Sequence, residues 1–168
     1  MSAFTDYVAG SMLIGTIATA VMDLCSAALH RFGGVPPPNY ALVGRWIAHM
    51  RAGRFRHDSM AAAAAVRGER LIGWTAHYLV GITFAALLLG IWGLEWTRRP
   101  ALGPALIVGF GTLAAPFLLM QPGMGAGIAA SRTPNPAAAR VRSPVNHGCF
   151  ALGLYVAGWL SRLLQSLW

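Results

Sequence analysis

Residues 7–31 read YVAGSMLIGTIATAVMDLCSAALHR, and this apolar stretch decides the fold. Asp23 is its one charged residue before the basic stop at Arg31. An α-helix rises about 1.5 Å per residue, so the segment is long enough to cross the roughly 30 Å hydrocarbon core of a bilayer. The sequence therefore predicts a first membrane span over about residues 7–30.

Small residues form a stripe along this span. Ser11, Gly15, Thr19, Asp23 and Ala27 follow one another at i, i+4 spacing, which places them on one face of the helix. Small side chains let a second helix approach closely inside a membrane. We therefore expect other spans to pack against this stripe, and the stripe carries the Asp23 carboxylate.

The composition of the whole chain is typical of a membrane protein. It is 56% hydrophobic and 11% charged, whereas a soluble domain is roughly a quarter charged. The thirteen basic residues are all Arg and contribute to a net charge of +8. They cluster beside the apolar spans, where retention of loops in the cytoplasm explains them, so no nucleic-acid partner is expected. Cys25 and Cys149 lie inside apolar segments without metal-ligand spacing, and no cofactor is expected.

Three further apolar segments follow the first, over about residues 71–94, 101–130 and 144–164. The second repeats the stripe of small residues, with Gly73, His77, Gly81 and Ala85 at i, i+4 spacing. We therefore predict one all-α domain over residues 1–168, a polytopic bundle of four transmembrane helices. The first and second spans are expected to cross near residues 15–23 and 73–81.

Prolines give more detail on the later spans. Pro116 and Pro122 predict a kink in the third span. Ser143 followed by Pro144 predicts the start of the fourth helix, with a hydroxyl at the N-cap and proline at the first helical position.

Two loops, over residues 31–70 and 131–143, separate the spans on one side. In the first loop, Asn39 is predicted to cap an amphipathic helix over Tyr40–Met50. The apolar face of that helix includes Trp46, and it suits either the membrane surface or the protein's own loops. Asp58 or Ser59 could cap a second short helix over residues 61–65.

The distribution of arginines favours one orientation in the membrane. The two loops together hold ten arginines, and the remaining three are Arg98, Arg99 and Arg162. Because cytoplasmic loops carry an excess of basic residues, we expect both loops in the cytoplasm and both termini outside. The basic loops would also meet anionic lipid headgroups at the bilayer surface.

All four spans carry a polar residue near the cytoplasmic leaflet, namely Asp23, His77, Gln121, Asn146 and His147. Ionisable groups within a membrane normally face other helices or a cavity. We therefore expect a polar cluster that either fixes helix packing or binds a small solute or ion. A metal site of Asp23, His77 and His147 would have the two-His-one-carboxylate composition, but the different depths of these residues disfavour it.

The loops supply a second set of candidate binding residues, which are Asn39, Arg45, His57, Asp58, Arg132 and Asn135. Three functional classes remain open. A small permease or ion-coupled carrier would need a water-accessible path to Asp23. An assembly subunit would use its helix stripes and basic loops for partners, a second copy of the chain included. A membrane enzyme would use His57, Asp58, His77 or Asp23 as acid or base.

Several segments resemble a known family. They are NYALVGRW (39–46), HDS (57–59), GERLIGWTAHY (68–78), PFLLMQPGMGAGIAASRTPNP (116–136) and H-x-C-F-x-L-G-L-Y from His147 to Tyr155. Together they resemble the bacterial inner-membrane proteins grouped as domain-of-unknown-function family 2938, over nearly the whole chain. The resemblance implies a four-span protein of the bacterial inner membrane, whose termini the arginine count would place in the periplasm. It implies no activity, substrate or catalytic residue.

Overall fold

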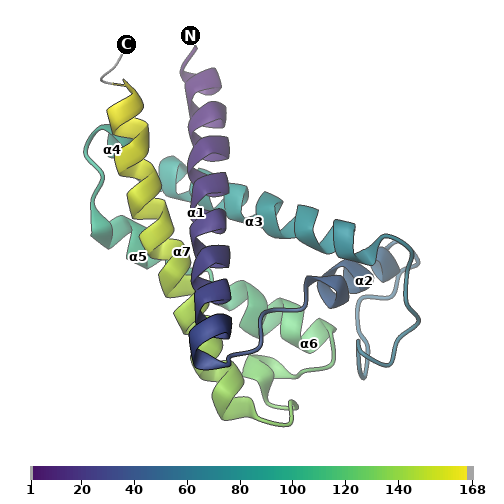
Figure 1. Cartoon of the computed structure of the whole chain (residues 1–168). Coiled ribbons are helices and arrows are strands. Elements are labelled where there is room, and N and C mark those ends of the chain that lie inside the picture. The colour runs from purple at the N-terminus through teal and green to yellow at the C-terminus, as the bar shows by residue number, and fades with distance from the viewer. Residues whose placement is uncertain (1, 166–168) are drawn as a thin grey trace. The chain divides into compact units, whose positions relative to one another are not determined.

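The computed structural model describes residues 2–165, and within that range it contains helices and turns and no strand (Figure 1). The all-α class is therefore confirmed. The chain divides into two compact units. The span unit comprises Met1–Pro36, Tyr78–Thr112 and Val145–Trp168, and the loop unit comprises Pro37–His77 and Leu113–Pro144.

Helix α1 (Ala3–Gly33) extends the predicted first span at both ends. The Ser2 hydroxyl caps its start by accepting a hydrogen bond from the backbone N–H of Thr5 (3.2 Å). Gly34 ends it in the left-handed conformation, with φ of 65°, which glycine adopts without steric cost. This helix is the longest element of the span unit.

The stripe of small residues makes the helix contacts of the span unit. A Cβ added to Gly15 of α1 would collide with the backbone of Ile82 in α3 (Glu69–Trp92), and one added to Gly81 would collide with the Thr19 side chain. The predicted crossing of the first two spans is therefore confirmed at these residues. Gly73 differs from the prediction, because it lies in the loop unit and faces α2.

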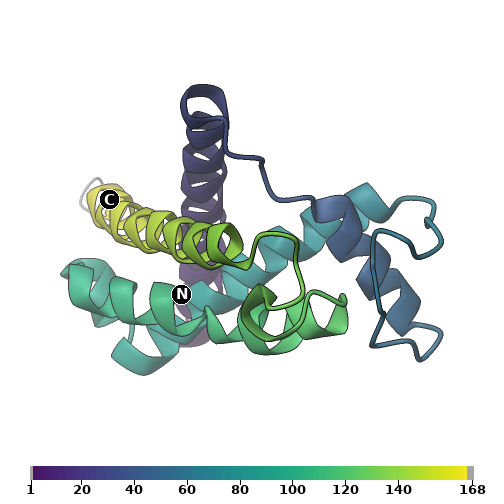
Figure 2. The same cartoon turned by 90° about the horizontal axis from the view of Figure 1, so that it is seen from below.

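Helices α4 (Glu95–Arg98) and α5 (Leu102–Gly111) and the part of α7 (Pro136–Gln165) from Val145 onward complete the span unit. Figures 1 and 2 show α7 crossing α1, where a Cβ on Gly153 would meet the backbone of Ala18. The core between these helices is formed by Ile14, Ala18, Ala85, Leu88, Leu89, Trp96, Ala105, Val108, Phe150, Leu154 and Ala157. Small and large side chains alternate in it, so the helix axes can approach closely.

Three helical segments among the described residues are long and apolar enough to cross a membrane, namely Ala3–Gly33, Glu69–Trp92 and Leu102–Gly123. Helix α7 does not meet the same criterion of length and hydropathy. The third segment is not a continuous α-helix, because α5 is followed by a π-helical stretch, η1 (Ala115–Met120), with Pro116 near its start. The kink predicted at Pro116 and Pro122 stays a prediction. The segment ends in α6 (Gln121–Gly123), and the short 3₁₀ helix η2 (Ile128–Ala130) follows it.

The predicted start of the fourth helix is wrong. Helix α7 begins at Pro136, and Pro144 lies inside it. Asn135 performs the capping assigned to Ser143, since its side-chain oxygen accepts a hydrogen bond from the N–H of Ala138 (3.1 Å). In the pair Asn135–Pro136 a capping side chain also stands directly before a proline. This pair comes earlier in the same loop than Ser143–Pro144, and the helix begins at it.

The two helices predicted in the long loop have opposite outcomes. Helix α2 (Tyr40–Met50) is confirmed with its predicted bounds, and Asn39 caps it through the N–H of Ala41 (3.2 Å). Residues 61–65 form turns instead of a helix. The carbonyl groups of Met60, Ala63 and Ala64 accept hydrogen bonds from side chains of α2, so tertiary contacts replace the helical ones.

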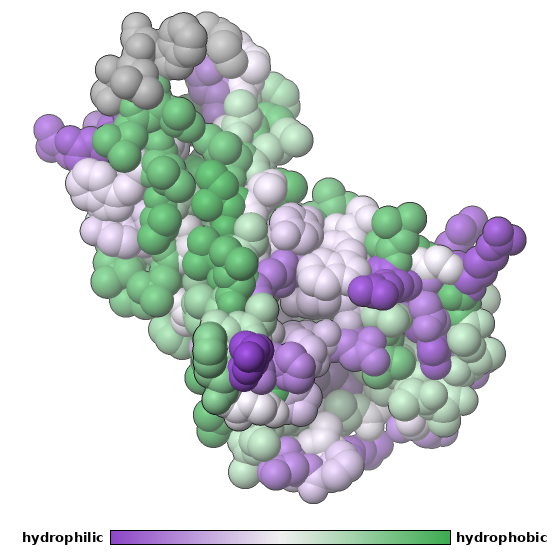
Figure 3. Space-filling view, viewed as in Figure 1, coloured by the Kyte–Doolittle hydropathy of each residue, from purple (hydrophilic) through white to green (hydrophobic). Residues whose placement is uncertain are grey.

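The surface of the span unit is largely apolar, and the figure shows hydrophobic side chains along α1 and α7 (Figure 3). Large exposed apolar side chains on these helices include Leu24, Leu152, Val156, Leu160 and Leu163. A soluble monomer rarely exposes so contiguous an apolar surface. The surface is therefore consistent with helices that face lipid.

Candidate functional site

The loop unit is held together by an ion pair between Arg45 of α2 and Glu69 at the start of α3. Nε and Nη2 of Arg45 each donate a hydrogen bond of 2.8 Å to the two carboxylate oxygens. Both side chains are largely buried, with 13% and 18% of their surfaces exposed. The bonds to Glu69 raise the pKa of Arg45 above its usual value, so the guanidinium stays charged.

Arg45 also organises the segment between the two helices. Its Nη1 donates to the carbonyl oxygens of Met60 (3.3 Å) and Ala63 (2.9 Å). Glu69 Oε2 accepts a further bond from the N–H of Val66 (2.9 Å). These contacts occupy most of the donors of Arg45, and its predicted role as a binding residue stays a prediction.

Helix α2 packs directly on the first turns of α3. A Cβ on Gly44 would collide with the Glu69 carbonyl, and a Cβ on Gly73 would collide with the Tyr40 carbonyl. The two helices therefore meet backbone to backbone at a glycine pair. Beside this contact, the ring of His77 stacks on Tyr40 with centroids 4.1 Å apart.

The contacts of Trp46 distinguish between the two predicted environments of α2, the membrane surface and the protein's own loops. The Trp46 indole is 8% exposed and packs against Gly123, and its Nε1 donates to the Phe55 carbonyl (2.9 Å). The apolar face of α2 thus packs against the protein's own loops at this residue, the second of the two alternatives.

Residues 57–60 run alongside residues 123–125. The N–H of His57 donates to the Gly123 carbonyl (3.0 Å), and the N–H of Met60 donates to the Met124 carbonyl (3.1 Å). Gly125 has φ of 89°, and a Cβ there would collide with the Asp58 carbonyl. Glycine at residue 125 is therefore required by the close approach of the two loops, whereas a Cβ on Gly123 would collide with the Trp46 indole of α2.

Two histidines connect α2 to this loop. His49 Nδ1 lies 2.9 Å from His57 Nε2, and His49 Nε2 lies 3.1 Å from the carbonyl oxygen of Ala64. The remaining ring nitrogen of His57, Nδ1, is buried and has no hydrogen-bond partner in the described part of the chain. The same is true of Oε1 of Gln121.

A basic cavity of about 450 Å³ opens beside His57. It is lined by Arg54, Arg56, His57, Asp58, Ser59, Ala62, Ala63, Pro122 and Arg132. Three guanidinium groups and one carboxylate make its charge positive. Such a cavity is suited to an anion, because guanidinium groups bind tetrahedral oxyanions through paired N–H donors. Three of the predicted loop residues, His57, Asp58 and Arg132, meet here.

In the span unit, Asp23 has a partner that the sequence analysis missed. Tyr78 Oη donates a hydrogen bond of 3.1 Å to Asp23 Oδ2. Tyr78 lies about one helical turn before Gly81, the residue at which α3 meets α1. This spacing puts both residues on the same face of α3, so Tyr78 could have been predicted as a partner of Asp23. The predicted approach of His77 and Gln121 to Asp23 stays a prediction.

His147 makes helix-to-helix contacts within the span unit. Its Nδ1 lies 2.9 Å from the Gly109 carbonyl oxygen and 3.2 Å from Thr112 Oγ1, at the end of α5. A Cβ on Gly109 would meet Ala151, so α5 and α7 are in close contact here. Asn146 precedes His147 and is half-buried.

Metal binding finds no support in these positions. Across residues 2–165, no group of three or more His, Cys, Asp or Glu side chains is arranged to hold a metal ion.

The family profile described as Protein of unknown function (DUF2938) matches residues 12–161. The chain belongs to the DUF2938 family. No curated protein and no solved structure matches it. Every residue that lines the basic cavity of this DUF2938 protein lies within the matched range.

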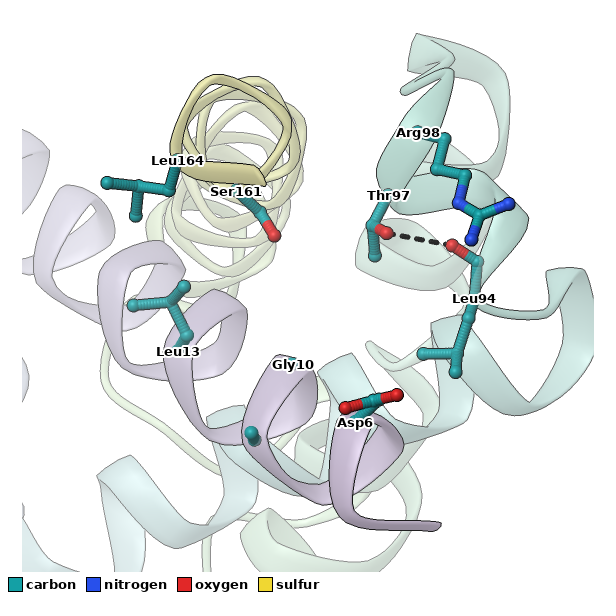
Figure 4. A pocket seen from close by; sticks show the side chains of 9 residues that line it. Asp6, Gly10, Leu13, Leu94, Thr97, Arg98, Ser161 and Leu164 are labelled. Atoms are coloured by element: carbon teal, nitrogen blue, oxygen red, sulfur yellow. Dashed lines mark hydrogen bonds between the residues drawn. The ribbon is translucent and has the colours of Figure 1, made fainter. Parts of the chain in front are cut away.

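A second cavity, of about 460 Å³, lies in the span unit of the DUF2938 protein (Figure 4). Its lining is Asp6, Ala9, Gly10, Leu13, Leu94, Thr97, Arg98, Ser161 and Leu164. Four of these residues, Asp6, Ala9, Gly10 and Leu164, lie outside the family match. Thr97 donates to the Leu94 carbonyl (2.8 Å), and Arg98 lies 3.3 Å from Glu95, so these two groups already have partners. The basic cavity is therefore the stronger candidate site.

Proposed function

We propose that this chain is a four-span protein of the bacterial inner membrane whose loop unit binds a phosphate-type anion on the cytoplasmic side. The anion is either free or the headgroup of an anionic lipid. Three apolar helical segments support the membrane location, and α7 would be the fourth span. The excess of arginines in the two loops supports their cytoplasmic location.

The observation that carries the proposal is the grouping of Arg54, Arg56 and Arg132 around one cavity. They come from two segments that are far apart in the sequence, and the backbone bonds from His57 and Met60 to residues 123 and 124 bring these segments together. All three arginines are exposed at the surface, so an anion can reach them. An anion bound there would offset the mutual repulsion of the three charges.

The surrounding contacts would hold the cavity in shape before an anion binds. Arg45 fixes the carbonyl groups of residues 60 and 63, and Ala63 itself lines the cavity. The close contact between Gly125 and the Asp58 carbonyl holds Asp58, a second lining residue, in place. A preformed site loses less conformational entropy on binding than a mobile loop does.

In this proposal, the polar residues of the spans serve helix packing. Tyr78 bonds to Asp23 between α3 and α1, and His147 bonds to the end of α5 from α7. Both contacts join neighbouring helices. They support the structural alternative over a path for solutes through the bundle.

The experiment is anion binding to the purified protein in detergent, measured by calorimetry with inorganic phosphate. The double variant Arg54→Gln/Arg56→Gln should bind phosphate at least about tenfold more weakly, because each charge-assisted hydrogen bond contributes about 1.5–3 kcal/mol. Arg67→Gln/Arg70→Gln is the matched control, since both arginines are exposed in the loop unit but do not line the cavity. The control should bind phosphate as the wild type does.

A second arm distinguishes the source of the anion. The protein is reconstituted into nanodiscs of phosphatidylcholine with or without phosphatidylglycerol, and the phosphate titration is repeated. Competition by phosphatidylglycerol would identify a lipid headgroup as the ligand, whereas unchanged affinity would identify a free anion. Equal phosphate binding by wild type and the Arg54/Arg56 variant would contradict the proposal.

A further inference from the structure

We infer that the basic cavity takes up its anion together with one proton, which binds Nδ1 of His57. This inference rests on the proposed anion site and specifies its second ligand. It follows from the hydrogen bonds of two neighbouring imidazole rings and from the charges that surround them.

The hydrogen bonds determine which ring nitrogens carry protons. His49 Nε2 faces the carbonyl oxygen of Ala64, which only accepts, so this nitrogen must carry a proton. In the neutral ring, His49 Nδ1 is then an acceptor, and its partner His57 Nε2 must be the donor. In the neutral His57 ring, Nδ1 is therefore the unprotonated nitrogen.

This nitrogen is free to accept a proton. His57 Nδ1 is buried and has no hydrogen-bond partner among the described residues. All other nitrogens of the two rings are engaged, so a proton entering the pair has one place to bind without breaking a bond.

Charged groups around His57 couple the proton to the anion. The charged groups near His57 are Arg54, Arg56 and Asp58 in its own segment, His49 and Arg45 in α2, Glu69 at the start of α3, and Arg132 in the segment after η2. With the cavity empty, the three arginines that line it oppose a further positive charge on His57. An anion in the cavity offsets them, so anion and proton each favour binding of the other.

The test uses sulfate, a tetrahedral dianion that keeps its charge across the neutral pH range. Calorimetry in two buffers of different ionisation enthalpy measures how many protons are taken up per sulfate bound. Within the range in which imidazole titrates, wild type should take up a measurable fraction of one proton per sulfate, and its affinity should fall as the pH rises, by no more than about tenfold per pH unit. His57→Gln should bind sulfate without proton uptake, and its affinity should not depend on pH.

His30→Gln is the matched control, because His30 is exposed and lies in the span unit. It should keep the proton uptake of the wild type. Sulfate binding by wild type without proton uptake overturns this inference and leaves the anion site standing. Absence of sulfate binding at every pH overturns both. Proton uptake that persists in His57→Gln overturns the assignment to His57, and the wild-type measurement decides alone if that variant does not fold.

Discussion

Tyr78 Oη donates a hydrogen bond of 3.1 Å to the Asp23 carboxylate and thereby joins α3 to α1. Four residues before Asp23, the Thr19 side chain fills the space left by Gly81. The carboxylate therefore sits beside the helix crossing and has a donor from the facing helix. A charged aspartate at the centre of a span opposes insertion by about 2.5–3.5 kcal/mol, and such a partner offsets part of that cost.

We predict that removing the acceptor at residue 23 destabilises the span unit. Asp23→Leu leaves the Tyr78 hydroxyl without its acceptor and should lower the free energy of unfolding by about 1–3 kcal/mol. Asp23→Asn keeps an acceptor and should stay close to wild type. Unfolding in mixed micelles, followed by circular dichroism, measures both. Equal stability of the Leu and Asn variants would show that the contact contributes nothing.

The backbone contact between α2 and α3 gives a second prediction. Gly44→Ala places a methyl group against the Glu69 carbonyl, so the helices must separate, at a cost of about 1–3 kcal/mol. Gly103→Ala is the control, since nothing lies within 4 Å of a Cβ added there. The control should be neutral, or more stable by up to about 1 kcal/mol, because alanine favours a helix over glycine. Thermal unfolding of the two variants in the same detergent compares them.

The Arg45–Glu69 pair gives a third prediction. Arg45→Lys keeps the charge but cannot make the two parallel bonds to Glu69, so the segment from residue 60 to residue 66 should loosen. Trypsin should then cleave after Arg67 faster than in wild type, and mass spectrometry of the fragments measures the rate. Arg31→Lys, at an exposed arginine of the span unit, should leave that rate unchanged. A rate unchanged in Arg45→Lys would argue against the structural role of the pair.

Local signals allowed much of the helical layout to be predicted. Asn39 followed by an amphipathic pattern gave α2 its bounds, and the spacing of Gly15 and Thr19 predicted a contact with Gly81. Both predictions used sequence patterns that extend over only a few helical turns. Family membership was also recognisable, because the segments that carry it are contiguous.

Tertiary contacts account for what the sequence analysis missed. Residues 61–65 favour a helix, but Arg45 and His49 bind carbonyl groups around that stretch. The basic cavity was not predicted: His57, Asp58 and Arg132 were separate candidate residues, and Arg54 and Arg56 were not among the candidates. Its assembly depends on backbone bonds between residues more than sixty positions apart, for which no local pattern exists.

The orientation in the membrane gives a fourth prediction. Reporter fusions after Trp96 should be active only outside the cytoplasm, and fusions after Gly34 only inside, because ten of the thirteen arginines lie in the two loops. Alkaline phosphatase and a fluorescent protein report the two sides. A cytoplasmic signal from the fusion after Trp96 would reverse the orientation and place the basic cavity on the outer side.

The most direct test of the anion site is to locate a bound anion. Tungstate is a heavy tetrahedral analogue of phosphate, and its anomalous scattering identifies its position in crystals of the protein. We predict one tungstate among Arg54, Arg56 and Arg132, within about 3 Å of guanidinium nitrogens, the length of a charge-assisted hydrogen bond. Tungstate bound only at other arginines, with this cavity empty, would contradict the account.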